Sequence, residues 1–218
     1  MRRILPAVVL ALAAFVAAAA ARPASTPVFK PRPRVTLIGD SIAAGIAYVP
    51  DARRLLARGI DLRLDVRVCR RLVGESCPYD GQRPPNVLDT VAATGTALGR
   101  VVVIDVGYND YAEEYPQGID DVMRSLTAAG VRTVVWVTLR EKHSMYPPIN
   151  AAIRRAARRW RQIVVLDWNA YSRGRPAWFV GDGLHLNPRG ALGLAKLIRP
   201  AVVASACKQA CAPPKTAA

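Results

Sequence analysis

Short, nearly continuous apolar runs alternate with helical patterns along this chain, and this alternation constrains the fold more than any other feature. The three clearest runs are residues 101–106, 131–139 and 163–166. Runs of this length without polar alternation are typical of central strands that are covered on both faces of a parallel sheet. Helical patterns lie between and after them, near 117–129, 148–161 and 188–204. The chain is therefore predicted to be an α/β protein.

Two earlier segments predict the order of the strands. Val35 to Ile38 is a short apolar run before Gly39 and is predicted to be the first strand. Over residues 62–68, apolar and charged side chains alternate, which predicts a strand with one wet face and hence an edge of the sheet. A second strand at the edge is typical of the flavodoxin-like order. We expect a three-layer α/β/α sandwich around a mostly parallel five-stranded sheet of order 2-1-3-4-5.

The N-terminal residues resemble an export signal. Arg2 and Arg3 precede an apolar stretch over residues 4–21 that ends in small residues, as in a cleavable signal peptide. The stretch is also long enough for a retained N-terminal membrane anchor, although Pro6 interrupts it. We expect a secreted or extracytoplasmic protein, with the anchor as the alternative. The predicted organisation is a signal peptide (1–21), a flexible lead-in (22–33), one domain (34–206) and a C-terminal tail (207–218).

The composition is strongly basic. Among 218 residues, 31 Lys and Arg stand against 16 Asp and Glu, so the formal net charge is +15. Such a field attracts anionic surfaces, which for an exported protein are cell-wall polymers or lipid headgroups rather than nucleic acid. A cluster on one predicted helix could contact such a surface or simply form a solvated face: Arg154, Arg155, Arg158, Arg159 and Arg161. We expect a monomer.

Four cysteines form two close pairs. An even number in an exported chain suggests disulfides, although the sequence permits three connectivities. We favour Cys69–Cys77, which closes a short loop. Cys207–Cys211 is the weaker prediction, because an intact helix does not aim such side chains at each other. The cysteine spacing fits no zinc motif well and the chain has only two His, so no metal or organic cofactor is expected.

Polar segments follow the predicted strands and should meet at one rim, because open α/β sheets bind ligands beyond the carboxyl ends of their strands. The three segments are Gly39-Asp40-Ser41, Gly107-Tyr108-Asn109-Asp110 and Asp182-Gly183-Leu184-His185.

These segments contain the groups that nucleophilic catalysis needs. A Ser hydroxyl is activated when a His accepts its proton and a carboxylate orients that His. Ser41, His185 and Asp182 can fill these roles. A developing oxyanion needs fixed donors, and the Ser41 N–H and the Asn109 amide are candidates. The neighbouring polar residues are expected to hold loops rather than to react: Asp40, Gly107 and Asp110.

Each residue also has a plain structural interpretation. Ser41 could be only a helix cap, and Asp182 and Asn109 could be turn formers. His143 is the other candidate base, but no Asp stands near it at a suitable spacing. The presence of all three segments in order favours a catalytic site over a set of caps and turns.

In order and spacing, the three segments resemble the sequence blocks of the SGNH (GDSL-type) hydrolases, and the resemblance covers most of residues 34–204. It implies that Ser41 is the nucleophile, that Asp182 and His185 complete a triad, and that Asn109 is an oxyanion donor. One block departs from the family. There a Gly usually follows the second strand and supplies a further N–H donor, whereas here Val68 is followed by Cys69, Arg70 and Arg71. We assign this donor to the Arg70 N–H, with Gly74 as the alternative.

The resemblance also implies an acyl-Ser41 intermediate that water or an acceptor hydroxyl resolves. We expect a small acyl group, acetyl on a carbohydrate in the first place, on an acylated small molecule or polysaccharide. The alternatives are a lipase or lysophospholipase of the same superfamily and a non-catalytic basic protein that binds the cell wall.

Overall fold

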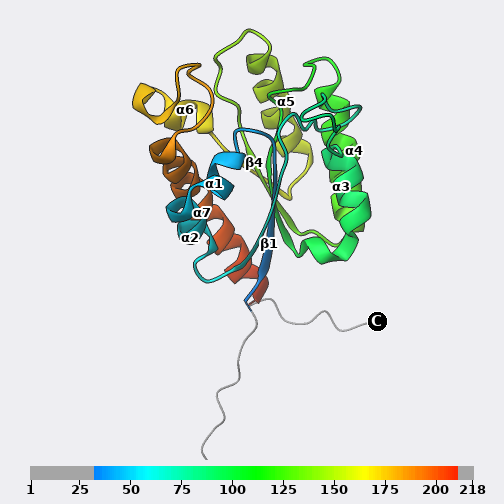
Figure 1. The fold of residues 1–218 in the computed structure, drawn as a ribbon. Helices are drawn as coiled ribbons and strands as arrows, with labels where there is room; N and C mark the ends of the chain where they lie inside the picture. Colours follow the sequence, from blue (N-terminus) through cyan, green and yellow to red (C-terminus); the bar gives the residue numbers. More distant parts are fainter. Residues whose placement is uncertain (1–31, 211–218) are drawn as a thin grey trace, which may run out of the picture. The chain divides into compact units, whose positions relative to one another are not determined.

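Five parallel strands form the sheet in the computed structural model, which describes residues 32–210. Their order is β2-β1-β3-β4-β5 (Figure 1), which confirms the predicted topology. The predicted signal peptide, most of the predicted lead-in, and Cys211 with the residues after it lie outside the described part. The strands are β1 (Arg34–Gly39), β2 (Asp61–Val66), β3 (Val101–Asp105), β4 (Thr133–Val137) and β5 (Ile163–Leu166).

Helices cover both faces of this sheet, which confirms the three-layer α/β/α fold (Figure 1). One face carries α1 (Ala44–Tyr48), α2 (Pro50–Ala57), α6 (Trp168–Ser172) and α7 (Pro188–Ala210). The other face carries α3 (Val87–Thr94), α4 (Tyr115–Ala128) and α5 (Tyr146–Arg159). Short 3-10 turns η1 (Gly95–Leu98) and η2 (Pro176–Trp178) complete the elements. A hydrophobic core lies on each face of the sheet, and successive residues of β3 point into opposite cores, Val103 on the α7 side and Val102 on the other. This alternation follows from the pleat of a strand.

The two edges of the sheet differ from each other. β2 is an edge, as predicted, and its side chains alternate between exposed and half-buried from Asp61 to Leu64. β5 is the other edge, and Val164 on it is 39% exposed. The prediction that residues 163–166 form a central strand was therefore wrong. Its apolar run resembles that of a covered strand, but within residues 32–210 the sheet ends at β5.

The helices differ from the prediction in two places: one helix was not predicted, and the last helix ends later than predicted. Sequence analysis did not predict α3, although Asn86 caps it by accepting a hydrogen bond from the Asp89 N–H at 2.8 Å. The last helix continues to Ala210, past its predicted end near residue 204. Ala206 is buried, so packing accounts for the helix as far as this residue.

α7 is a core helix of the domain. By length and composition alone, Pro188–Lys208 could cross a membrane, but half of that window is buried. Leu194 and Ile198 are fully buried in the core on the α7 side of the sheet. Its apolar character is therefore explained by packing against the sheet and α2.

Candidate active site

Ser41, His185 and Asp182 form a continuous chain of contacts at the carboxyl end of the sheet. Ser41 follows β1 and is half-buried, and its Oγ lies 3.0 Å from His185 Nε2. His185 Nδ1 lies 2.6 Å from Asp182 Oδ2. The structure thus brings together three side chains from segments 144 residues apart in the sequence. The geometry lets His185 accept the Ser41 proton while Asp182 holds the ring.

The Asp182 carboxylate is fixed by its own turn. Its Oδ1 accepts the N–H of Leu184 at 2.8 Å and that of His185 at 2.9 Å. Hydrogen bonding to the His185 side chain, and then to the Leu184 N–H, lowers the pKa of Asp182 to about 2. The carboxylate therefore stays ionised at neutral pH, as the partner of a protonated imidazole must.

Asp40 ties the first polar segment to the second. Its Oδ1 accepts the Ile42 N–H at 3.0 Å, and its Oδ2 accepts the N–H groups of Gly107 and Tyr108, both at 3.2 Å. Asp40 is fully buried, and this burial raises its pKa to about 6 against the opposing effect of the three N–H donors. A Cβ at Gly107, where φ is 151°, would lie 3.0 Å from the Leu139 side chain, so this tight turn favours glycine.

Asn109 and Asp110 connect the second segment to the loop after β2. Asn109 Nδ2 donates to the Arg70 carbonyl at 3.1 Å, which leaves the second amide hydrogen available. Asp110 Oδ1 accepts the Leu72 N–H at 2.8 Å. Burial raises the pKa of Asp110 to about 7. The residues predicted to support the site thus make hydrogen bonds within and between the rim loops.

The loop after β2 contains the predicted disulfide. Cys69 and Cys77 are bonded, which confirms this pairing. Cys69 has a φ of 66°, a left-handed conformation that favours glycine. The Arg70 N–H, predicted as an oxyanion donor, donates to the Arg67 carbonyl at 3.4 Å. The alternative donor, Gly74, is exposed and lies four residues further along this loop.

Two of the remaining sequence candidates lie away from this chain of contacts. The ring of His143 is exposed and packs edge-on against Tyr146 at 5.5 Å. Cys207 is exposed on α7, and since its predicted partner Cys211 is outside the described residues, that pairing stays a prediction. Over residues 32–210, no group of three His, Cys, Asp or Glu side chains is placed to hold a metal ion.

Arg140 holds the third segment in place, and sequence analysis missed it. Its Nε donates to the Gly183 carbonyl at 3.1 Å and its Nη1 to the Ser172 carbonyl at 3.0 Å. The guanidinium also stacks on the Phe179 ring, 4.0 Å from the centroid. Arg140 therefore positions the turn between Asp182 and His185. Its place just after β4, at the same rim, was the available signal.

Asp105 is a second missed residue. It ends β3 and is fully buried, and neither carboxyl oxygen has a hydrogen-bond partner among the described residues. Burial, and then the nearby Asp40 carboxyl, raises the pKa of Asp105 well above its usual range. Two carboxyl groups, those of Asp40 and Asp105, are thus fully buried near the site, and burial raises the pKa of each.

Comparison with known proteins identifies the class. The sequence model of the GDSL-like lipase/acylhydrolase family matches residues 37–191, which include all three polar segments. The chain belongs to this family, and the resemblance noted in the sequence is confirmed. This membership supports an enzyme that acts on esters.

Relatives and solved structures agree with this assignment. O-acetyltransferase OatA of several Staphylococcus aureus strains is 26% identical over 162 residues, which are 74% of this chain and 24% of OatA. The chain therefore spans about a quarter of the length of these curated relatives. A carbohydrate acetylesterase family member from Sinorhizobium meliloti has a TM-score of 0.59 at 13% identity, with 80% of this chain and 99% of that chain covered. A carbohydrate esterase family 3 structure from Talaromyces cellulolyticus has a TM-score of 0.54 at 15% identity, with 80% and 98% covered. At these identities the two structures show the shared fold alone.

Proposed function

We propose that the chain is a serine esterase or acyltransferase that removes or transfers an acetyl group carried by a carbohydrate, through an acyl-Ser41 intermediate. The single observation that supports this most is the contact chain from Ser41 Oγ through His185 to Asp182. Family membership supports chemistry on esters, and the contact chain supplies a nucleophile, a base and an orienting acid.

The proposed reaction has two halves. In the first, His185 Nε2 accepts the Ser41 proton as Oγ attacks the ester carbonyl carbon, and the imidazolium returns the proton to the departing sugar hydroxyl. In the second, water or an acceptor hydroxyl attacks the acyl carbon as His185 takes its proton, and the imidazolium then returns a proton to Ser41 Oγ as the acyl–serine bond breaks. Asp182 stabilises the imidazolium in both halves. Hydrolysis and transfer share the acyl-enzyme and differ only in the second nucleophile.

Three donors are proposed for the oxyanion. The first two are the Ser41 N–H and the free amide hydrogen of Asn109. For the third we now infer the Cys69 N–H instead of Arg70 or Gly74. Cys69 stands after β2, where the family usually has a Gly, and has a glycine-like φ of 66°, while the Arg70 N–H already donates to Arg67.

The substrate class is inferred from the relatives. The curated relative is named as an O-acetyltransferase, and two structural neighbours are described as carbohydrate esterases. Acetyl on a carbohydrate agrees with both descriptions. An exported location is part of the proposal, because the Cys69–Cys77 disulfide is of the kind that persists in oxidising compartments.

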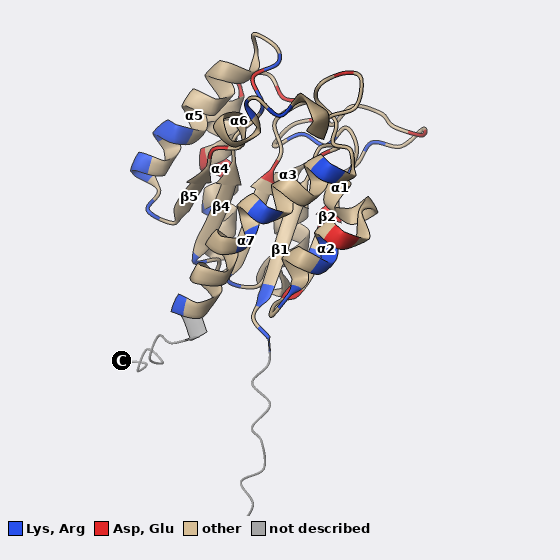
Figure 2. Cartoon of the chain, turned by 90° about the vertical axis from the view of Figure 1, so that its left-hand side faces the viewer, with Lys and Arg blue, Asp and Glu red and all other residues tan. Residues whose placement is uncertain are grey.

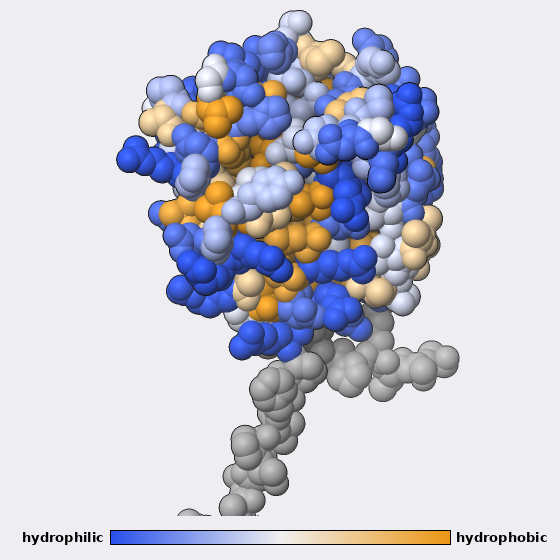
Figure 3. All heavy atoms as spheres, in the orientation of Figure 1, coloured by the Kyte–Doolittle hydropathy of each residue, from blue (hydrophilic) through white to orange (hydrophobic). Residues whose placement is uncertain are grey.

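The surface of the protein gives less support to the alternative functions, binding of an anionic polymer and lipase activity, than the contact chain gives to the proposed one. In the basic cluster on α5 (Figure 2), Arg154 pairs with Asp167 and Arg159 with Asp120, both at 2.8 Å. These pairs reduce the charge that an anionic polymer would meet. On the face shown in Figure 3, hydrophobic residues lie mostly on the side of α1, α2 and α7 and are interleaved with hydrophilic ones, which is typical of a solvated surface.

Hydrolysis of p-nitrophenyl acetate by the purified chain tests the proposal. Ser41→Ala and His185→Ala should each lower kcat by at least about 100-fold. Ser144→Ala and His143→Ala are matched controls at exposed positions and should retain activity. p-Nitrophenyl octanoate should be the poorer substrate if the acyl group is small. Wild-type turnover equal to that of Ser41→Ala would contradict the proposal.

A further inference from the structure

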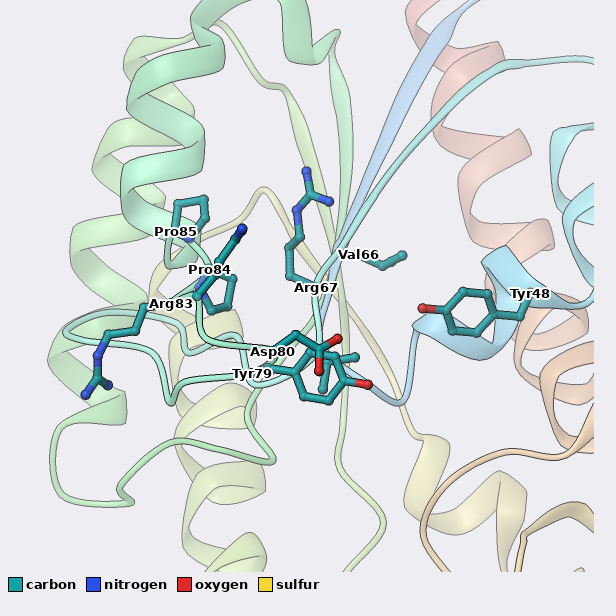
Figure 4. A pocket seen from close by; sticks show the side chains of 10 residues that line it. Tyr48, Val66, Arg67, Tyr79, Asp80, Arg83, Pro84 and Pro85 are labelled. Atoms are coloured by element: carbon teal, nitrogen blue, oxygen red, sulfur yellow. The ribbon is translucent and has the colours of Figure 1, made fainter.

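A cleft at the same end of the sheet as the proposed active site has no role in the acyl-transfer chemistry described so far. It has a volume of about 530 Å³ and lies between α1 and the loop that follows β2 (Figure 4). Volumes of this size are typical of small-molecule sites, and an acetyl group alone would fill only a small part of it. The cleft is therefore large enough for the part of a substrate that carries the acyl group.

The position of the cleft connects it to the nucleophile. Val66 lines it and pairs with Gly39 in the register of β2 and β1. The next lining residue, Arg67, donates its N–H to the Gly39 carbonyl at 3.0 Å. Gly39 is two residues before Ser41, and α1, which follows Ser41, ends at Tyr48 in the opposite wall. The cleft is therefore built on the strand end and the helix that flank Ser41, and a molecule bound in it would lie at the same edge of the sheet as the nucleophile.

The wall opposite Tyr48 is a tight hairpin. Tyr79 and Gln82 exchange backbone hydrogen bonds at 2.8 and 3.0 Å, and the two residues between them have left-handed φ values of 48° and 72°. The disulfide closes the loop just before the hairpin. Just after it, Arg83 donates to the Ser76 carbonyl at 2.8 Å. The hairpin that forms this wall of the cleft is therefore held from both sides.

The chemistry of the lining suits a sugar. Tyr48 and Tyr79 are 76% and 51% exposed, and Figure 4 shows their hydroxyl groups pointing toward each other across the cleft. Arg67, Asp80 and Gln82 add donors and acceptors to the lining. A sugar ring has apolar C–H faces and hydroxyls at its edge, and Tyr likewise combines an apolar ring with a polar tip. Exposed aromatic rings with convergent polar groups are a binding arrangement rather than a packing one.

We propose that this cleft, with Tyr48 and Tyr79 as its walls, binds the carbohydrate part of the substrate through ring contacts and hydroxyl hydrogen bonds. The inference rests on the proposed function for the reaction at Ser41. Binding of the sugar itself is a separate property, and it can be measured without catalysis.

The binding experiment uses Ser41→Ala protein and two neutral probes, chitotetraose and xylotetraose, with isothermal titration calorimetry. At least one probe should bind, and Tyr48→Ala and Tyr79→Ala should each weaken it by roughly 3- to 10-fold. Tyr111→Ala, which removes a tyrosine of similar exposure outside the cleft, should leave the affinity unchanged. Absence of binding by both probes, or equal affinity in the Tyr48→Ala/Tyr79→Ala double variant, would overturn the proposal.

A kinetic experiment separates this proposal from the proposed function. With Ser41 restored, each of the two Tyr→Ala variants should raise KM for the acetylated form of a probe that binds, and should leave p-nitrophenyl acetate hydrolysis unchanged. If p-nitrophenyl acetate is hydrolysed but KM for the sugar ester does not respond, the cleft proposal is wrong and the enzyme proposal stands. If p-nitrophenyl acetate is not hydrolysed but a probe binds and Tyr79→Ala weakens it, the cleft proposal stands without the enzyme.

Discussion

Asp40 and Asp182 both lie at the carboxyl end of the sheet, and their surroundings are opposite. Asp40 is fully buried, accepts three backbone N–H groups, and has a pKa raised to about 6. Asp182 is 47% exposed, holds the His185 ring, and has a pKa lowered to about 2. The two carboxyl groups thus have different tasks: the buried one organises the backbone, and the exposed one supports the proposed chemistry.

The largest expected effect separates the two carboxyls by activity. Asp182→Asn removes the charge that stabilises the imidazolium and leaves the rest of the rim in place. We expect kcat on p-nitrophenyl acetate to fall by about 10³- to 10⁴-fold, with a melting temperature close to that of the wild type. A fall of less than tenfold would mean that Asp182 is only a turn residue.

Asp40→Ala should act on stability. The substitution leaves the N–H groups of Ile42, Gly107 and Tyr108 without their acceptor, and each unsatisfied buried donor costs about 1–3 kcal/mol. We expect the free energy of unfolding, measured by urea titration, to fall by about 3 kcal/mol or more. Asp182→Ala is the matched control and should lower it far less, because its groups are open to water. Equal losses in the two variants would remove the distinction between them.

The pH dependence of the free energy of unfolding should reveal the raised pKa values of the buried carboxyl groups of Asp40 and Asp105. A carboxyl whose folded pKa is raised above 3.8 binds its proton more tightly when folded. Its contribution is fully present below about pH 3.8 and is lost as the pH rises through the folded pKa. Above about pH 3.8 and up to the folded pKa of Asp105, Asp105→Asn should therefore flatten the decline in unfolding free energy by up to about 1.4 kcal/mol per pH unit. Identical slopes for wild type and variant would contradict the raised pKa of Asp105.

The smallest expected effect concerns the proposed Cys69 donor. A left-handed backbone conformation has little steric cost for Gly and costs about 1 kcal/mol or more for other residues. Cys69→Gly/Cys77→Ala should therefore retain most of kcat, whereas Cys69→Ala/Cys77→Ala should lose it several-fold. Both variants lack the disulfide, so the comparison isolates the backbone conformation. If both lose activity equally, the disulfide rather than the left-handed geometry is what the site needs.

Sequence patterns predicted the strands correctly where both faces of a strand are covered, or where apolar and charged residues alternate. The covered runs of β3 and β4 and the alternating run of β2 indicated the strand order correctly. β5 was misassigned as central because an apolar edge strand and a covered strand share one pattern. The sequence signal for α3 was its cap residue, Asn86, and no helix was predicted from it.

The candidate site residues could be predicted where the residue type and its position in a segment indicate the chemistry. Ser41, Asp182 and His185 stand in recognisable segments, and the structure places them in contact. The left-handed φ of Cys69 could not be read from the sequence, because a non-glycine residue gives no sign of it. The roles of Arg140 and Asp105 depend on long-range contacts and burial, which only the folded chain reveals.

Covalent labelling of the intact chain with a fluorophosphonate, followed by peptide mass spectrometry, tests whether Ser41 is an activated nucleophile. We expect one modified serine, Ser41, and strongly reduced labelling in His185→Ala, while Ser144→Ala labels like the wild type. Absence of label on Ser41 under conditions that label a known serine hydrolase, or equal labelling in His185→Ala, would contradict an activated Ser41 nucleophile.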